Sequence, residues 1–323
     1  MTDLTVTTIN DLALRAALND AVSANISEAK STNTRRAYTA DWAHFTAWCD
    51  VNEESTLPAE PATVARYLSD IADDFKVATL ERRLVGIATA HRYANLESPT
   101  TAPIVRETFK GIRRRKAKAG EQQTQKEAAV TSVVVKLVET LDDTMSGVHD
   151  RALLLLGFAG AFRRSELAAL NVADVKFVAE GLVITVRMSK TDQDGVGSLK
   201  GIPYGSHLET CPVRSLKAWL EKAGIVEGPI FRPIDRHGNV KPKRLNAGSI
   251  PRIIKAAAAK AGLDPTLFSG HSLRAGLATA AAEAGVSERA IMAQTGHKSV
   301  LIARRYIRRG SLFRDNAAAE VGL

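Results

Sequence analysis

Residues 152–166, ALLLLGFAGAFRRSE, contain the longest apolar run of the chain and predict a buried helix. The run from Ala152 to Phe162 is shorter than the roughly 20 apolar residues that a membrane-spanning helix needs. Arg163 to Glu166 follow it directly and are polar. Because arginine is rarely buried without a partner, this turn requires an anionic partner or an exit to solvent. The second half of the chain is therefore expected to form around a buried helix that ends in a charged turn.

The hydrophobic period changes downstream of this turn from helical to strand-like. Residues 172–178 and 182–186 are β-branched runs, and residues 198–204 are a third candidate strand. The stretch 190–195 before the third run is polar and contains glycine, which is typical of a hairpin turn. The remaining C-terminal sequence has helical spacing. These features predict one small antiparallel sheet within a mainly helical domain.

The sequence before residue 118 shows helical spacing and no strand-like alternation. Tyr38, Trp42, Phe45 and Cys49 recur at helical intervals, so one apolar stripe faces a core. A last helix ends in six basic residues between Lys110 and Lys118. The polar stretch that follows has no periodicity and is interpreted as an interdomain linker.

These patterns predict a mainly α fold of two domains, with a small antiparallel β-sheet in the second. The length of 323 residues also favours two domains. The expected boundaries are an N-terminal extension over residues 1–24, a helical domain over 25–116, a linker over 117–130 and a second domain over 131–323.

The composition is that of a globular protein with a basic balance. Hydrophobic residues make up 45% and charged residues 24%, which excludes a disordered chain and a collagen-like fibre. Residues 1–109 carry 10 Lys and Arg against 15 Asp and Glu, whereas residues 241–314 carry 14 against 3. A positive field concentrated in this way favours a nucleic acid partner; a basic protein with solvated faces is the alternative.

Cysteine usage and the N-terminal sequence indicate the compartment. The two cysteines, Cys49 and Cys211, are far apart and have neither disulfide-framework nor metal-site spacing. The N-terminus lacks the pattern of a signal peptide. We therefore expect a cytoplasmic, DNA-associated protein with no membrane partner.

Several residues in the basic C-terminal half are candidates for phosphate chemistry. His271 and Arg274 lie three apart at an expected helix start, where free backbone N–H groups also attract anions. His297 follows, and Tyr306 is flanked by four arginines. Taken singly, each has an ordinary explanation, such as a structural histidine or a core aromatic residue. Lys190 lies in the expected hairpin loop and, considered alone, would be interpreted as a solvent-exposed lysine.

Taken in order, these residues resemble the catalytic pattern of the tyrosine recombinase (phage integrase) family. The matching stretches are 161–167, with Arg163 and Glu166; 189–191, with Lys190; 271–274; 295–297; and Tyr306. Within the family the resemblance is closest to Cre-type recombinases, extending to Trp48-Cys49, residues 58–61 and the basic residues 112–115. It covers roughly residues 25–320 and implies a helical core-binding domain and a catalytic domain that together form a C-shaped DNA clamp.

The resemblance also implies a role for each matched residue. Tyr306 would attack a DNA phosphodiester to give a 3′-phosphotyrosyl link, and several nearby cations would favour its phenolate. Arg163 and Arg274 would hold the non-bridging oxygens through bidentate hydrogen bonds. The remaining roles are proton exchange and phosphate contact by His271 and His297, protonation of the departing 5′ oxygen by Lys190, and orientation of the cations by Glu166. No ATP, metal or other cofactor is expected.

Two positions depart from the expected pattern. Arg164 stands where relatives often carry an apolar residue, so the choice of Arg163 rests on the Arg-x-Ser-Glu match. His297 occupies a position that is tryptophan in Cre-type enzymes, and histidine there is common in the wider family. Neither residue identity says which histidine exchanges a proton with the tyrosine.

The implied partner is duplex DNA carrying an inverted-repeat recombination site, bound by a homotetramer that pairs two sites. The apolar face of the tail, residues 312–321, would dock into a neighbouring protomer. Candidate DNA-contacting residues are basic and lie on expected helices: Arg35, Arg36, Arg82, Arg83, Arg113, Arg114, Arg115, Arg252 and Lys255.

Three other functions compete with this one. A DNA-binding regulator is suggested by the helix-turn-helix-like stretch 281–297, but it would not need Tyr306. A metal-dependent nuclease would need clustered carboxylates, and residues 241–314 hold only Asp264, Glu283 and Glu288. A type IB topoisomerase has similar chemistry, and the recombinase-like N-terminal domain argues against it.

Overall fold

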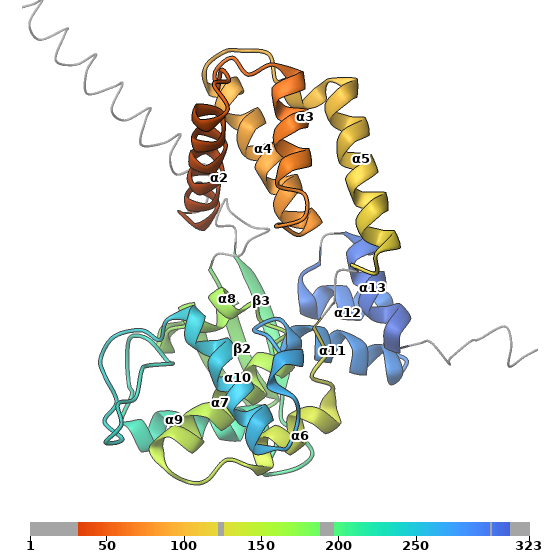
Figure 1. Cartoon of the computed structure of the whole chain (residues 1–323). Helices are drawn as coiled ribbons and strands as arrows, with labels where there is room; N and C mark the ends of the chain where they lie inside the picture. Colours follow the sequence, from red (N-terminus) through yellow and green to blue (C-terminus); the bar gives the residue numbers. More distant parts are fainter. Residues whose placement is uncertain (1–31, 122–125, 188–196, 298, 311–323) are drawn as a thin grey trace, which may run out of the picture. The chain divides into compact units, whose positions relative to one another are not determined.

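The computed structural model describes residues 32–121, 126–187, 197–297 and 299–310 (Figure 1). The chain divides into two compact units at Thr124–Gln125, inside the stretch expected to link the domains. The described elements are mainly helices, with a small antiparallel sheet in the second unit, so the predicted fold class is confirmed. The N-terminal extension, Lys190 and the tail 311–323 lie outside the described residues.

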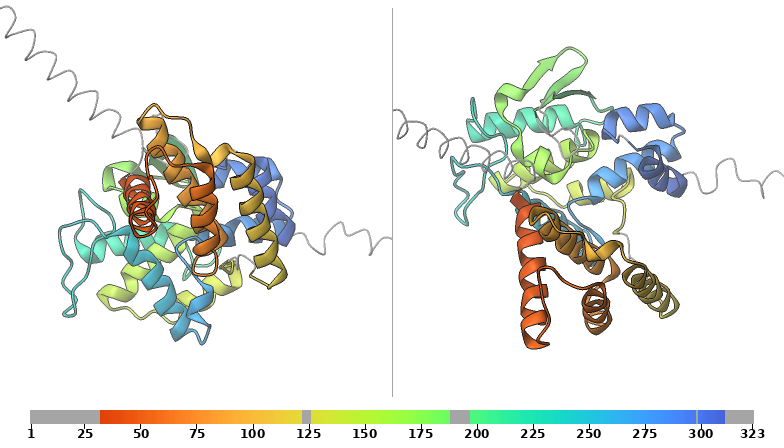
Figure 2. Two further views of the ribbon diagram at one scale, coloured as in Figure 1. Left: turned by 45° about the horizontal axis from the view of Figure 1, so that its top comes forward. Right: turned by 90° about the horizontal axis from the view of Figure 1, so that it is seen from above.

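Unit 1 is a bundle in which α2 packs on α4 and α3 packs on α5 (Figure 2). Its described elements are α2 (Thr32–Val51), α3 (Pro61–Asp70), α4 (Val77–Tyr93), η1 (Pro99–Thr101) and α5 (Pro103–Lys118). Phe45 and Cys49 from the predicted stripe are fully buried, and Trp42 packs against the same cluster. Burial of this stripe against α3 and α4 supplies the apolar area that holds the unit together.

Unit 2 is organised around α7, which contains most of the apolar run 152–162. Leu153, Leu154 and Leu156 are fully buried, and α7 packs against α9 and α11. No helix in the described ranges is both long enough and apolar enough to cross a membrane. The described helices of the unit are α6 (Thr131–Glu139), α7 (Met145–Ala159), α8 (Arg164–Ala169), α9 (Pro212–Ala223), α10 (Ile250–Lys260), α11 (Ser272–Glu283), α12 (Glu288–Thr295) and α13 (Val300–Gly310), with short 3-10 helices η2 (Val172–Asp174), η3 (Ala247–Ser249) and η4 (Pro265–Leu267).

The sheet of unit 2 has the strand order β1-β2-β3, with both pairs antiparallel. Its strands are β1 (Val175–Val178), β2 (Gly181–Val186) and β3 (Ser198–Pro203). Residues 172–174, expected in the first strand, form the 3-10 turn η2 instead, because the Asp174 carboxylate accepts a hydrogen bond from the Asn171 backbone and closes the turn. Alternate residues of β3 face the core, and one of them is a lysine, Lys200, paired in register with Ile184.

Residues 126–130 of the expected linker are attached to unit 2, whereas Ala117 and Lys118, at its start, belong to α5 of unit 1. The backbone N–H of Glu127 donates to the Leu267 carbonyl at 2.8 Å, and that of Ala129 donates to the Ser272 carbonyl at 2.9 Å. Ala129 itself is fully buried. This segment therefore packs as part of the second unit.

The close packing of this segment predicts the effect of Gly276→Ala. A Cβ at position 276 of α11 would lie 1.9 Å from the Ala129 carbonyl oxygen. We expect unit 2 to be destabilised by about 1–3 kcal/mol, the usual cost of overpacking, measured by thermal unfolding. The control is Gly111→Ala on α5, where a Cβ meets nothing within 4 Å and should stabilise the helix by about 1 kcal/mol. An unchanged unfolding temperature for Gly276→Ala would contradict the packing described here.

Candidate active site

The turn between α7 and α8 positions Arg163 through its ion pair with Glu166. Ala161 adopts a left-handed backbone conformation with φ of 46°, which reverses the chain at the end of α7. The Glu166 carboxylate accepts from the Arg163 backbone N–H at 2.9 Å and from Arg163 Nη1 at 2.6 Å. The Glu166 side chain is 3% exposed and that of Arg163 is 18% exposed. Arg164 is exposed, so Arg163 is the arginine that this carboxylate holds in place.

Arg274, on α11, presents a buried guanidinium with unused donors. Its Nη1 donates to the Ala161 carbonyl at 2.8 Å, and the residue is 1% exposed. Among the described residues, Nε and Nη2 have no hydrogen-bond acceptor. Burial, with a contribution from Arg163, lowers the pKa of Arg274 to about 10. Since unpaired buried donors are costly, these N–H groups are suited to an anionic ligand.

Tyr306 and His271 form the direct contact of the site. The Tyr306 hydroxyl lies 2.6 Å from His271 Nε2, although the two residues are 35 positions apart. They meet because α11, which begins just after His271, packs along α13, which carries Tyr306 (Figure 1). Tyr306 is 8% exposed.

His297 contacts the tyrosine through its ring face. The two rings are stacked with centroids 5.6 Å apart and planes 13° apart. Gly296 ends α12 in a left-handed conformation, with φ of 64°, and so turns the chain to present His297. Nδ1 of His297 is hydrogen-bonded to the Thr295 hydroxyl at 2.8 Å. His271 is therefore at proton-transfer distance from the phenol, whereas His297 stacks on its ring.

Burial and the nearby cations act on the Tyr306 phenol in opposite directions. Burial raises the pKa of Tyr306, and this effect outweighs the lowering by Arg274 and Arg305. Arg274 and Arg305 thus favour the phenolate, but burial outweighs them in the protein without DNA, so the phenol is protonated at neutral pH. Burial, with Arg274 and Arg163, lowers the pKa of His271 from its ordinary value, so its imidazole is neutral and can accept a proton.

These shifts predict the histidine titration of the free protein. We expect His297 to titrate near pH 4, because burial and the neighbouring cations lower its pKa to about 4, and His271 to titrate below its ordinary value of 6.5. Both imidazoles are then neutral at pH 7 and charge only as the pH falls. NMR titration of the imidazole Cε1 protons, assigned with His297→Gln and His271→Gln, measures both values. A midpoint at or above 6.5 for either histidine would contradict the site's electrostatics.

Lys200 also lies at this site, and the sequence analysis did not identify it. It is 6% exposed, and burial, together with Arg274 and Arg163, lowers its pKa to about 8, partly offset by Glu166. The available signal was its position in β3, two residues before the buried Ile202 and on the same face. Lys190 lies outside the described residues.

The candidate DNA-contacting residues fall into different environments. Arg82 is half-exposed and forms an ion pair with Asp41 at 2.7 Å. Arg83 is 5% exposed, donates to the Tyr67 hydroxyl and packs 3.8 Å from the centre of the Phe75 ring, so we withdraw it from the DNA-contacting set. Arg35 is half-buried, and the exposed members are Arg36, Arg113, Arg114, Arg115, Arg252 and Lys255.

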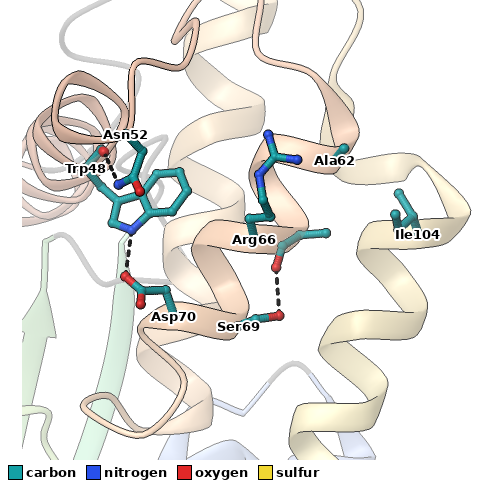
Figure 3. A pocket seen from close by; sticks show the side chains of 8 residues that line it. Trp48, Asn52, Ala62, Arg66, Ser69, Asp70 and Ile104 are labelled. Atoms are coloured by element: carbon teal, nitrogen blue, oxygen red, sulfur yellow. Dashed lines mark hydrogen bonds between the residues drawn. The ribbon is translucent and has the colours of Figure 1, made fainter.

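A surface hollow of about 520 Å³ lies in unit 1, far in sequence from Arg163, His271 and Tyr306. Figure 3 shows Trp48 and Asp70 on its wall, joined by a 2.7 Å hydrogen bond, and Ile104 of α5 on another side. Its lining contains no histidine, cysteine or tyrosine. It carries none of the groups that the sequence pattern brings together in unit 2.

The helix-turn-helix-like stretch is part of the same site. α11 and α12 are joined by the short turn 284–287, as the sequence pattern of residues 281–297 indicates. However, α11 carries Arg274 and packs against α13 and its Tyr306, in addition to α12. The helix pair therefore packs together with Arg274 and Tyr306, which a simple regulator would not require.

Comparisons with known proteins identify the family of this chain. Residues 130–311 match the phage integrase family. The "Integrase/recombinase xerD homolog" of Selenomonas ruminantium is 41% identical over 296 residues, which cover 90% of this chain and 86% of the relative. The "Recombinase cre" of Escherichia phage P1 is 27% identical over 285 residues, covering 83% and 80%. The XerD homolog is thus the more similar of the two, and the expectation that Cre-type enzymes are nearest is not supported.

A solved structure shows the same fold. The Tn1549 transposon integrase, solved in complex with transposon right end DNA, superposes with a TM-score of 0.65 at 12% identity, covering 90% of this chain and 93% of that one. The family match includes every residue of the site described above. The chain therefore belongs to the phage integrase family of site-specific tyrosine recombinases.

Proposed function

We propose that this recombinase cleaves and rejoins duplex DNA through a 3′-phosphotyrosyl intermediate, without ATP or metal. The observation that carries the proposal is the Tyr306 hydroxyl, 2.6 Å from His271 Nε2 and in electrostatic interaction with the buried Arg274, whose Nε and Nη2 have no acceptor among the described residues. A nucleophile, a base and a preorganised anion site are the parts that phosphoryl transfer requires. That the Tn1549 integrase was solved on transposon-end DNA supports duplex DNA as the substrate.

The cleavage step uses these groups in a fixed order. The Tyr306 oxygen attacks phosphorus while its proton passes to the neutral His271, which general-base catalysis requires. Arg274 and Arg163 bind the non-bridging oxygens as negative charge develops, and Glu166 keeps Arg163 in place by its 2.6 Å ion pair. The bond to the 5′ oxygen breaks, and we assign the proton for this leaving group to Lys190.

Rejoining reverses these events with another DNA end. A 5′-hydroxyl from the partner strand attacks the phosphotyrosine and gives its proton to the Lys190 amine that cleavage left deprotonated. The bond between phosphorus and the Tyr306 oxygen breaks, and His271 returns its proton to that oxygen. One phosphoester bond is lost and one is formed at each step, so the reaction needs no external energy source. A two-site exchange therefore leaves the number of DNA phosphoester bonds unchanged.

Covalent capture on a nicked duplex tests the proposal. The substrates are duplexes that together cover the DNA beside the gene, each with a nick just 3′ of the phosphate under test. After cleavage, the short strand with the 5′-hydroxyl diffuses away, so rejoining cannot occur and the covalent intermediate accumulates. We expect a denaturation-resistant adduct, and mass spectrometry of the digested adduct should place the nucleotide on Tyr306. Exchange between two marked sites then separates a recombinase from a type IB topoisomerase, which would only relax supercoils. Absence of any adduct across the DNA that these duplexes cover would sink the proposal.

We further propose that four protomers pair two inverted-repeat sites, with the two domains closing on DNA as a C-shaped clamp. The exposed residues Arg36, Arg113, Arg114, Arg252 and Lys255 would contact the DNA backbone, since phosphate contacts from basic side chains supply most of the sequence-independent affinity. Arg35, Arg82 and Arg115 are further candidates. Their ion pairs and partial burial would have to rearrange for contact.

The tetramer proposal predicts the effect of deleting residues 311–323. If this tail docks into a neighbouring protomer, deletion should reduce strand exchange below detection while binding to a single half-site stays within about twofold, because that binding rests on phosphate contacts elsewhere. Electrophoretic mobility shift and two-site recombination assays measure the two quantities. If the truncated protein recombines at the wild-type rate, the tail is not needed to assemble the tetramer.

A further inference from the structure

Lys200 is a buried charged residue that the proposed mechanism leaves without a role. It lies on the core-facing side of β3, is 6% exposed, and its Nζ is 5.4 Å from the centre of the Phe162 ring. Burying an ammonium group without partners costs free energy, so its contacts are expected to matter. Burial lowers its pKa to about 8, which shows that the surroundings oppose its charge.

The hydrogen-bond partner of Lys200 is the end of α12. Its Nζ donates to the backbone carbonyl of Gln294, in the last turn of that helix. Carbonyls in a last helical turn have no partner within the helix, and the helix dipole favours a cation there. Lys200 therefore acts as a side-chain cap from a strand 94 residues away in sequence.

Gln294 joins three elements at this point. Its Nε2 donates to the Ala159 carbonyl at the end of α7, at 2.8 Å, and to the Gly201 carbonyl on β3, at 3.2 Å. The next residue, Thr295, is hydrogen-bonded to His297, and the ring of His297 stacks on Tyr306. The anchored carbonyl is thus three residues before the stacked imidazole.

We propose that Lys200 is a positioning residue of the active site: by binding the Gln294 carbonyl it fixes the end of α12 and holds the His297 ring against Tyr306. Its hydrogen bond is to a backbone carbonyl, so it acts through the backbone of residues 294–297. The consequence for cleavage rests on the proposed function. The structural part of the inference does not, and it can be tested in the protein without DNA.

Hydrogen exchange in the free full-length protein tests the structural part. Lys200→Met keeps the length of the side chain and removes the donor. We expect amide exchange in residues 294–297 to accelerate about 5- to 10-fold, as loss of one such hydrogen bond implies, while exchange in α9 is unchanged. The matched control is Lys176→Met, at an exposed position of β1 in the same sheet, which should alter neither region. Unchanged exchange in residues 294–297, or an equal increase throughout unit 2, would overturn the inference.

The rate of covalent adduct formation tests the functional part. We expect Lys200→Met to slow cleavage about 100-fold, the effect of a misplacement near 1 Å, with DNA affinity unchanged. Lys200→Arg should restore most of the rate, because a guanidinium can donate to the same carbonyl. In a His297→Ala background, Lys200→Met should cost less than about threefold, since the group that it positions is already absent.

The outcomes separate this inference from the proposed function. Fully additive losses in the double variant, or slower cleavage with unchanged exchange, would mean that Lys200 acts apart from His297, and would overturn the inference. Altered exchange with an unchanged cleavage rate would overturn it as well. If the wild-type protein forms no adduct on any duplex, the proposed function fails, and the exchange experiment still decides whether Lys200 fixes α12.

Discussion

Tyr306→Phe is expected to abolish the covalent protein–DNA adduct and to reduce strand exchange by at least about 1,000-fold. The substitution removes the only atom of this side chain that can attack phosphorus, and no water-based route replaces a lost nucleophile efficiently. The phenyl ring still fills the space between His271 and His297, which lie at centroid distances of 5.8 Å and 5.6 Å. Folding and DNA binding should therefore be retained.

Three measurements check this expectation together. Denaturing electrophoresis on a nicked duplex detects the adduct, a mobility shift assay measures binding, and thermal unfolding measures stability, which should fall by about 1 kcal/mol for the lost hydrogen bond to His271. Tyr204→Phe is the matched control, because Tyr204 is 43% exposed and lies outside the site. An adduct formed by Tyr306→Phe at the wild-type rate would assign the nucleophile to another residue.

Arg274→Lys should reduce the cleavage rate by about 100- to 1,000-fold, the usual cost of removing a preorganised donor to a transition-state oxygen. Lysine keeps the positive charge, and its ammonium can still donate to the Ala161 carbonyl that Arg274 binds at 2.8 Å. It lacks the planar fork whose Nε and Nη2 now have no acceptor among the described residues. The loss therefore measures geometry rather than charge.

The comparison for Arg274→Lys is Arg236→Lys, which makes the same exchange at an exposed position of unit 2. The control should cleave at the wild-type rate. Single-turnover cleavage with saturating protein separates the chemical step from binding. A decrease in the cleavage rate smaller than about tenfold for Arg274→Lys would show that Nε and Nη2 of Arg274 do not contact the phosphate.

Much of the fold could be predicted because it depends on local hydrophobic pattern. The run 152–162 predicts the buried part of α7, and the β-branched runs predict strands, since both follow from which side chains must avoid water. The exception at residues 172–174 arises because one carboxylate, that of Asp174, closes a turn on the Asn171 backbone. A side-chain contact of this kind outweighs the β-propensity of a short run.

Burial of charged residues was the part that the sequence could not predict. In the sequence, Arg83 and Lys200 cannot be distinguished from cations on the protein surface. In the structure both are buried: Arg83 is 5% exposed and Lys200 is 6% exposed. Their burial depends on partners distant in the chain, Tyr67 for Arg83 and Gln294 for Lys200. Such partners become neighbours only when the helices and strands have packed.

The sequence by itself determined the chemical set of this recombinase: an ordered series of arginine, lysine, histidine and tyrosine side chains in a basic, mainly helical chain. Only the tertiary structure decided how the set is arranged. It pairs Arg163 rather than Arg164 with Glu166 and brings His271 rather than His297 to the Tyr306 hydroxyl. It also buries Lys200, which donates to the Gln294 carbonyl. The physical reason is that hydrogen bonds act over about 3 Å, and distances of that order between remote residues are set by packing.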